Sequence, residues 1–299
     1  MRRSPQFLRT AHALAAAVLL ALVFAAQAGA AADHARFERP VMMDSDGPGN
    51  ELYVLDDAGV LHEFRVSANS LSEFGRVSVP ADFQAADMSF ARSEQPPSLF
   101  IAGTQAGRGV ALRFSLDSRT LKTWTFQNVC SGVDSGANSR TAYVATSDSN
   151  ELYRLDLDGE HITFVTRIPD ASKLGPVAFD EAGQMVYVAD VASGRIYQYS
   201  IAARSAKVFA TGLSAPTALV FDAESNRLFV ADPGQRAIFT VDTRAAKPAI
   251  EPFVSAPLKT PYGMTLISED RIAVADYGAN TIFVFSSKGA LLFRYPSGQ

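Results

Sequence analysis

The chain has 299 residues, of which 47% are hydrophobic and 19% charged, and its formal net charge at pH 7 is −4. Acidic residues outnumber basic ones without a basic run, which argues against nucleic acid and anionic membranes as partners. The single cysteine, Cys130, excludes an internal disulfide, and we interpret it as a small buried apolar side chain. The hydrophobic core must therefore stabilise the fold alone.

The first 30 residues have the pattern of a secretory signal peptide. Arg2, Arg3 and Arg9 form a positive start, residues 13–26 are apolar, and small residues in small-x-small order follow. The apolar run is shorter than the roughly 20 residues of a membrane-spanning helix. We therefore expect a signal peptide over residues 1–30 with cleavage between Ala28 and Asp33, no membrane span, and a periplasmic or secreted protein.

A pattern of three strands recurs in the second half of the chain. It reads GPVAFD, MVYVAD and RIYQY over residues 175–199, and APTALVFD, RLFVAD and AIFTVD over residues 215–242. It returns as TPYGMTL, RIAVAD and TIFVF over residues 260–285. Self-similarity at a fixed period of this size is typical of a repeat architecture.

The central residue of the second strand in each unit sets the period. The intervals are 47, 43, 44, 42 and 44 residues between Val54, Ile101, Val144, Val188, Val230 and Val274. Six units of this length fill the mature chain, and each has room for four strands. The sequence therefore predicts an all-β fold over residues 34–299, a six-bladed β-propeller of four-stranded antiparallel blades, with Arg36–Glu38 beside the last blade.

An aspartate ends the second strand in four units, at Asp56, Asp190, Asp232 and Asp276. Aspartate at a strand exit is a common turn device, because its carboxylate accepts hydrogen bonds from N–H groups one to three residues later. We favour this interpretation over a ring of metal ligands. We also interpret residues 44–51 as a polar hairpin loop, since Pro48 and Leu55 break the pattern of a calcium loop.

The repeated unit resembles the NHL repeat, and it is similar to the blade of the gluconolactonase–senescence marker protein superfamily. The resemblance covers residues 36–299 and implies a six-bladed propeller. In the lactonase relatives it also implies a divalent metal, held by a Glu, an Asn and an Asp at the starts of inner strands. The corresponding positions read Val177-Ala178, Thr217-Ala218 and Tyr262-Gly263, without such ligands, so we expect no metal and no cofactor.

The starts of the six inner strands should surround one mouth of the central channel, since each inner strand runs along the axis. These positions are Val41, Asp87, Ser131, Val177, Thr217 and Tyr262. Apolar walls with a few polar groups are typical of ligand pockets. We therefore expect an uncharged or weakly polar small molecule, or a protein, to bind there through Asp87, Ser131, Thr217 and Tyr262, with Asp87 as the only charge. The alternative is that these side chains only fill the channel.

Two functions remain open from the sequence. The first is a monomeric, exported scaffold that binds a ligand or protein without chemistry of its own. The alternative is a metal-dependent lactonase or hydrolase, as the resemblance implies. One propeller scaffold hosts many activities, so the fold does not decide between them.

Overall fold

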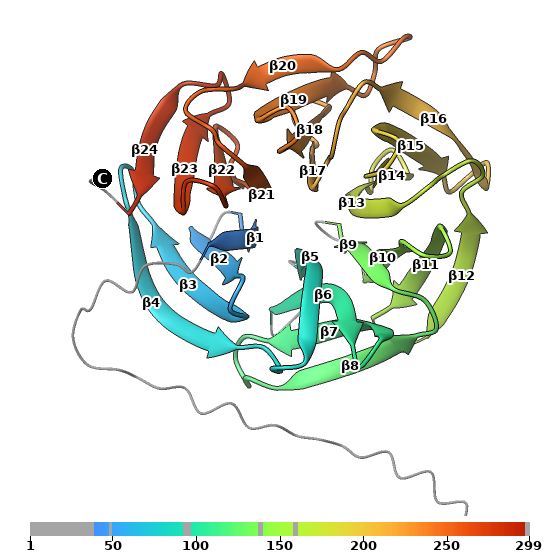
Figure 1. The fold of residues 1–299 in the computed structure, drawn as a ribbon, viewed down its shortest axis with the longest axis horizontal. Helices are drawn as coiled ribbons and strands as arrows, with labels where there is room; N and C mark the ends of the chain where they lie inside the picture. Colours follow the sequence, from blue (N-terminus) through green and yellow to red (C-terminus); the bar gives the residue numbers. More distant parts are fainter. Residues whose placement is uncertain (1–38, 48–49, 92–96, 137–139, 158–160, 297–299) are drawn as a thin grey trace, which may run out of the picture.

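The structure of the chain is a computed structural model that describes residues 39–47, 50–91, 97–136, 140–157 and 161–296. These residues form 24 strands and no helix, arranged in six four-stranded antiparallel sheets around a central axis (Figure 1). The prediction of a six-bladed β-propeller is confirmed. The predicted signal peptide and Arg36–Glu38 lie outside the described residues. Within the described part of the chain, no helix has the length and apolar character to cross a membrane.

Each blade consists of four consecutive strands, numbered outward from the axis. Blade 1 has β1 (Pro40–Ser45), β2 (Glu51–Asp56), β3 (Val60–Val66) and β4 (Leu71–Ser78). Blade 2 has β5 (Phe83–Ala91), β6 (Ser98–Gln105), β7 (Arg108–Ser115) and β8 (Leu121–Phe126). Blade 3 has β9 (Cys130–Asp134), β10 (Thr141–Thr146), β11 (Glu151–Asp156) and β12 (Ile162–Arg167).

The second half of the chain repeats this order. Blade 4 has β13 (Leu174–Asp180), β14 (Met185–Asp190), β15 (Arg195–Ser200) and β16 (Ser205–Thr211). Blade 5 has β17 (Ala218–Asp222), β18 (Arg227–Asp232), β19 (Ala237–Asp242) and β20 (Glu251–Val254). Blade 6 has β21 (Pro261–Ser268), β22 (Arg271–Asp276), β23 (Thr281–Ser286) and β24 (Leu291–Tyr295).

The core lies between the blades. The buried apolar residues form six clusters, one at each junction between neighbouring blades. The second strands supply the centre of each cluster, and Val188 and Val230 occupy equivalent, fully buried positions in blades 4 and 5. Because both faces of such a strand are covered, its sequence is a continuous apolar run. Cys130 is also fully buried, as expected.

The aspartate that ends a second strand connects two turns. The Asp190 carboxylate accepts the loop N–H groups of Ala192 and Ser193 at 3.1 and 3.2 Å, which confirms the predicted turn device. It also accepts the N–H groups of Ser172 and Lys173, at 2.7 and 3.0 Å, from the segment that leads into β13. Blades 5 and 6 repeat this second pair of bonds. The carboxylate therefore fixes both the turn and the start of the inner strand.

The ring closes without exchange of a strand between blades 1 and 6 in the described part of the chain. Each sheet contains only consecutive strands, and β1 lies beside β21. Polar contacts join the two blades next to this seam. The Arg39 N–H donates to Asn280 Oδ1 at 3.0 Å, and its guanidinium donates to the Tyr277 hydroxyl at 2.8 Å.

Candidate functional site

The six inner strands surround a cavity of about 220 Å³ on the axis. Its lining residues come from β1, β5, β9, β13, β17 and β21, and extend into the turns at Asp180–Ala182 and Ala223, where inner strands end. The cavity thus extends from the starts of the inner strands to their ends. A concave space lined by all six blades is the leading candidate for a binding site.

The structure separates the four predicted site residues. Asp87 and Thr217 line the cavity, together with Val41 and Val177. The other two residues lie outside its lining. The Ser131 hydroxyl donates to the Ala145 carbonyl at 3.3 Å, and the Tyr262 ring lies 6.2 Å from that of Tyr277.

Neighbouring inner strands approach each other closely beside two of the predicted residues. A Cβ atom on Gly132 would lie 2.2 Å from the Gly175 carbonyl oxygen, and one on Gly263 would lie 2.5 Å from that of Val41. Only glycine permits such contact between neighbouring backbones. Gly132 and Gly263 directly follow Ser131 and Tyr262, so these two predicted residues sit where the blades meet rather than where the channel widens.

Three aspartates on blades 1 to 3 face the cavity, so Asp87 is not its only charged group as the sequence suggested. Asp44 lies on β1 and Asp134 at the end of β9. Each carboxylate accepts a backbone N–H from the inner strand of the next blade, from Phe90 to Asp44 at 2.6 Å, from Val133 to Asp87 at 3.0 Å, and from Phe179 to Asp134 at 2.7 Å. These carboxylates therefore tie the inner strands together as well as lining the space.

Hydroxyl groups make the corresponding links in blades 5, 6 and 1. The Thr217 hydroxyl donates to the Tyr262 carbonyl at 2.8 Å, and the Thr265 hydroxyl donates to Asp44 Oδ1 at 2.6 Å. Ser45 donates to the Leu266 carbonyl at 2.5 Å. A belt of polar side chains thus joins inner strands around much of the channel, and Thr217 has a structural partner of its own.

Sequence reasoning missed Asp44 and Asp134. Asp44 was assigned to a hairpin loop, but β1 continues through Ser45, so the loop is shorter than predicted. The repeat register holds the signal that could have found them. Asp44 and Asp134 each follow the inner-strand residue that pairs with the central valine, which is Met43 in blade 1 and Val133 in blade 3.

Burial and mutual repulsion shape the ionisation of these carboxyl groups. Burial raises the pKa of Asp87, hydrogen bonds from the Val133 and Met88 N–H groups lower it, and nearby Asp134 raises it, to about 8 in total. Burial is also the main cause that raises the pKa of Asp134, with a further contribution from Asp44. Like charges in a poorly solvated space disfavour full ionisation.

The cavity has one acidic and one apolar side. Asp180 and Glu181 add to the three inner aspartates, and no Lys, Arg or His occurs among its described lining residues. The remaining wall, on blades 5 and 6, is mainly apolar, with Ala218, Val220 and Met264 among its members. This division favours a ligand with hydrogen-bond donors at one end and an apolar body at the other.

The aspartates do not fit a metal centre of the lactonase type. All six oxygens of Asp44, Asp87 and Asp134 accept hydrogen bonds from protein N–H or O–H groups. In the part of the chain that the structure describes, no group of three His, Cys, Asp or Glu side chains could hold a metal ion. We therefore derive no chemistry through a metal at this site.

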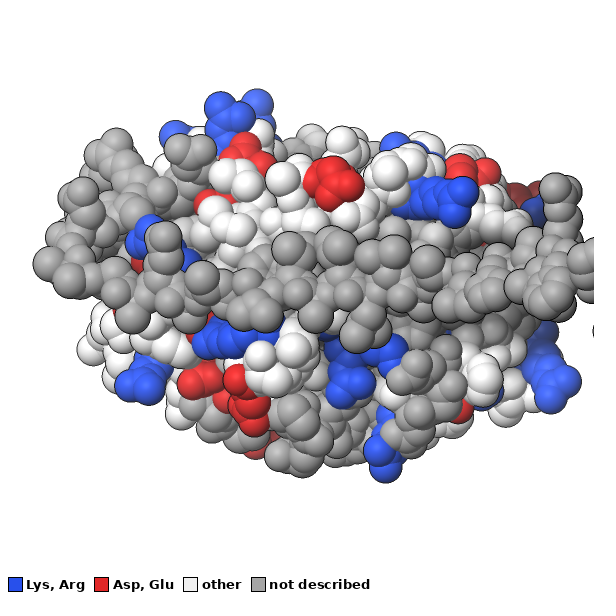
Figure 2. Space-filling view, turned by 90° about the horizontal axis from the view of Figure 1, so that it is seen from below, with Lys and Arg blue, Asp and Glu red and all other residues white. Residues whose placement is uncertain are grey.

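The described residues on one side of the outer surface give no comparable electrostatic signal. On the side seen in Figure 2, acidic and basic side chains are interspersed among uncharged ones and form no patch of one sign. The expectation that nucleic acid is not a partner stays a prediction.

Comparison with known proteins supports the architecture. No protein-family model matches the sequence, and no curated protein matches it significantly. Solved structures do match. A protein of unknown function from Bacteroides thetaiotaomicron has a TM-score of 0.66 and 11% identity, over 87% of this chain and 70% of that chain. Virginiamycin B lyase from Staphylococcus aureus has a TM-score of 0.61 and 14% identity, over 88% and 85%.

A chain of a nidogen/laminin complex has a TM-score of 0.65 and 14% identity, over 80% of this chain and 90% of that one. The chain has a β-propeller fold. At 11–14% identity these matches establish the fold alone.

Proposed function

We propose that the protein is an exported, NHL-like β-propeller that binds a small organic cation in its central cavity, without chemistry of its own. One observation carries this proposal: five acidic and no described basic side chains line a cavity whose other wall is apolar. The N-terminal signal pattern supports export, and the repeat pattern supports the NHL-like assignment.

Charge and size define the ligand class. A cationic group beside Asp44, Asp87 and Asp134 relieves the repulsion among their carboxylates, whereas an anion would increase it. A carboxylate has about four lone-pair positions, so these groups can accept bonds from a ligand in addition to those from the protein. The cavity volume of about 220 Å³ limits the ligand to a small molecule.

Binding should be coupled to proton release. Because the pKa of Asp87 is about 8, this carboxyl is largely protonated at pH 6 and ionises as the pH rises. A cation favours the ionised form, so its affinity should increase from pH 6 to pH 8. A neutral ligand that accepts a hydrogen bond from protonated Asp87 would show the opposite dependence.

Three probes of matched size test the ligand class: 2-phenylethylamine, 2-phenylethanol and phenylacetate, titrated into the protein by calorimetry at pH 6, 7 and 8. We expect the amine to bind in about the millimolar range or tighter, given its size. It should bind more tightly than the alcohol, and the carboxylate should bind least. Equal affinities, or tighter binding of phenylacetate, would overturn the proposal.

Two variants locate the binding site. Asp134→Asn should weaken the amine at least fivefold while the alcohol changes little, because only the cation depends on the carboxylate charge. Asp270→Asn is the matched control, since its side chain is 75% exposed and lies outside the cavity. An equal loss in both variants would contradict binding in the channel. A micromolar site for Ca²⁺, Zn²⁺ or Mn²⁺ that disappears in Asp87→Ala would instead favour the lactonase alternative.

A further inference from the structure

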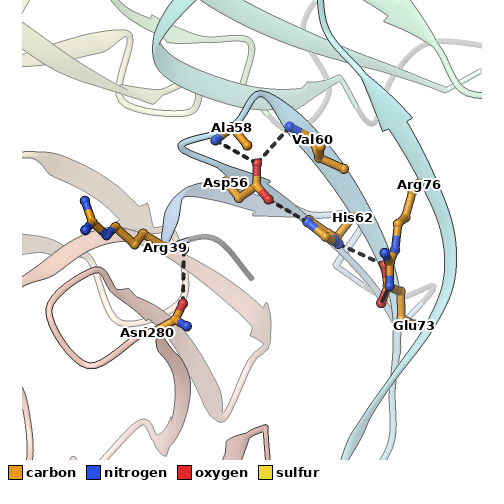
Figure 3. A network of polar contacts seen from close by, with 8 residues as sticks. All are labelled: Arg39, Asp56, Ala58, Val60, His62, Glu73, Arg76 and Asn280. Carbon is orange, nitrogen blue, oxygen red and sulfur yellow. Dashed lines mark hydrogen bonds and ion pairs between the residues drawn. The ribbon is translucent and has the colours of Figure 1, made fainter. Parts of the chain in front are cut away.

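His62 on β3 is buried between two carboxylates of blade 1, away from the central cavity. Only 3% of the residue is exposed. Its Nε2 lies 3.0 Å from Asp56 Oδ2 at the end of β2, and its Nδ1 lies 2.8 Å from Glu73 Oε1 on β4 (Figure 3). The imidazole therefore links the second, third and fourth strands of the blade.

This geometry requires two protons on the imidazole ring. A neutral imidazole carries one N–H, and an ionised carboxylate can only accept hydrogen bonds. Two ring nitrogens that each face a carboxylate oxygen can both form hydrogen bonds only if His62 is an imidazolium or one carboxyl is protonated. The neighbours of the two carboxyl groups decide between these states.

Both carboxyl groups accept hydrogen bonds from other neighbours as well. The Arg76 guanidinium donates to both oxygens of Glu73, with the Nη2–Oε2 contact at 2.8 Å. Burial raises the pKa of Glu73, but hydrogen bonds from His62 and Arg76 outweigh it and lower the pKa overall. The other oxygen of Asp56 accepts the N–H groups of Ala58 and Val60 at 3.1 and 2.8 Å, so every described partner of this carboxyl group other than His62 is a donor.

Comparison of the blades shows what His62 replaces. In blades 4, 5 and 6 the strand-end aspartate accepts two backbone N–H groups from the segment that leads into the inner strand. In blade 1 the corresponding N–H of Arg39 donates to Asn280, and Asp56 accepts the His62 ring instead. A backbone N–H never titrates, whereas an imidazole does. Among the four blades whose second strand ends in aspartate, blade 1 is thus the one in which the structure shows a titratable donor to that aspartate.

We propose that His62 is an imidazolium in the folded protein and that its deprotonation loosens blade 1, which makes this blade a pH-sensitive element at the seam of the ring. Loss of one ring proton leaves either Asp56 or Glu73 without a donor from His62. Glu73 keeps Arg76, so Asp56 Oδ2 is the oxygen that loses its partner. A buried carboxylate oxygen without a donor is destabilising.

The charged groups described around His62 are consistent with this assignment. Burial lowers the pKa of His62, but its hydrogen bonds to Asp56 and Glu73 raise it above the ordinary value overall. On β3 itself, Glu63 is paired with Arg119 of blade 2, and Phe64 stacks near the imidazole at 6.3 Å. On β24, Tyr295 lies close enough to Glu73 and Arg76 to interact with their charges, and carries no charge at neutral pH.

The sign of the pH effect follows from linkage. A histidine whose folded-state pKa is raised contributes stability that is fully present below the unfolded-state pKa of about 6.5, and this stability is lost as the pH rises through the folded-state pKa. Openings that expose His62 should therefore become more frequent by up to about tenfold per pH unit within that window. Blade 1 should be tightest under acidic conditions.

Nitrogen-15 NMR of histidine-labelled protein tests the charge state directly. At pH 6.5 both ring nitrogens of His62, assigned by their loss in His62→Gln, should have imidazolium shifts, and His62 should titrate above the ordinary histidine value of about 6.5. A neutral tautomer of His62 at pH 6.5 would overturn the proposal.

Amide hydrogen exchange independently tests whether blade 1 loosens when His62 loses its proton. Protection factors in β2 to β4 should fall between pH 6.5 and 8.5 relative to those in β14 to β16, where Asp190 has only backbone partners from the preceding segment. In His62→Gln, which cannot titrate, this relative change should disappear; His161→Gln is the matched control. Parallel behaviour of the two blades in the wild-type protein would contradict the inference.

Discussion

At the scale of single residues, Asp87 links two inner strands and also faces the central cavity. Its carboxyl receives the Val133 N–H of the next blade and faces the cavity. Because its pKa is raised to about 8, the folded state retains a proton that the unfolded chain releases near pH 4. Stability from this site is therefore greatest at low pH and decreases as the pH rises towards 8.

We expect Asp87→Asn to remove this dependence, because the amide cannot ionise. The urea midpoint of the wild-type protein should fall relative to that of the variant between pH 5 and pH 8. Asp82→Asn, which changes an exposed residue shortly before it in the chain, serves as the control and should follow the wild-type curve. A constant difference between wild type and Asp87→Asn across this range would show that Asp87 is already ionised at pH 5.

The candidate site was only partly predictable from individual residues. Asp87 and Thr217 line the cavity, because the period of the repeat gives the position of each inner strand, and their role in binding stays a prediction. Ser131 and Tyr262 were placed at an open mouth, but the neighbouring glycines bring the backbones together there. That approach depends on packing between blades, which the sequence of one blade does not contain.

At the scale of the element, the strand-end aspartate acts as a connector between strands. Asp232 is fully buried and accepts the N–H groups of Ser214 and Ala215, at 2.7 and 3.0 Å, besides that of Gln235 at 3.2 Å. Replacing it leaves three part-buried N–H groups without their carboxylate partner. Each such donor costs about 1–3 kcal/mol.

Asp232→Ala should therefore lower the free energy of unfolding by about 3–5 kcal/mol in chemical denaturation. Asp222→Ala provides the comparison, because its hydrogen bond with the Glu224 N–H lies in an exposed turn. That variant should lose less than about 1 kcal/mol. Similar losses in the two variants would mean that Asp232 is only a turn residue.

Strand positions were the most predictable elements. Val188 and Val230 lie where the period places them, since a strand covered on both faces needs a run of apolar residues. The end of β1 was less predictable. Asp44 and Ser45 look like loop residues by composition, but their side chains bond to neighbouring blades and keep them in the strand.

At the scale of the whole molecule, six whole blades close a ring without a shared sheet in the part of the chain that the structure describes. No described sheet contains strands from both ends of the chain. The seam between blades 1 and 6 has its own apolar cluster and the hydrogen bonds of Arg39. His62 lies in blade 1, beside this seam. A change in its charge therefore affects a blade whose junction with blade 6 has neither a covalent connection nor a shared sheet in the described part of the chain.

Because each blade is built from consecutive strands, the two ends of the described chain lie between blades 6 and 1. A circular permutant would move these ends to another place in the ring. A circular permutant that begins at Lys247, in the exposed connection between β19 and β20, would carry β20 at one end and β17 to β19 at the other. With residues 296 and 39 joined by a flexible linker, the pairing of β19 with β20 would hold the two ends together. We expect this permutant to fold, and to unfold more slowly than the native chain in stopped-flow measurements. Faster unfolding of the permutant would show that the native seam already holds the ring as firmly as a shared sheet does.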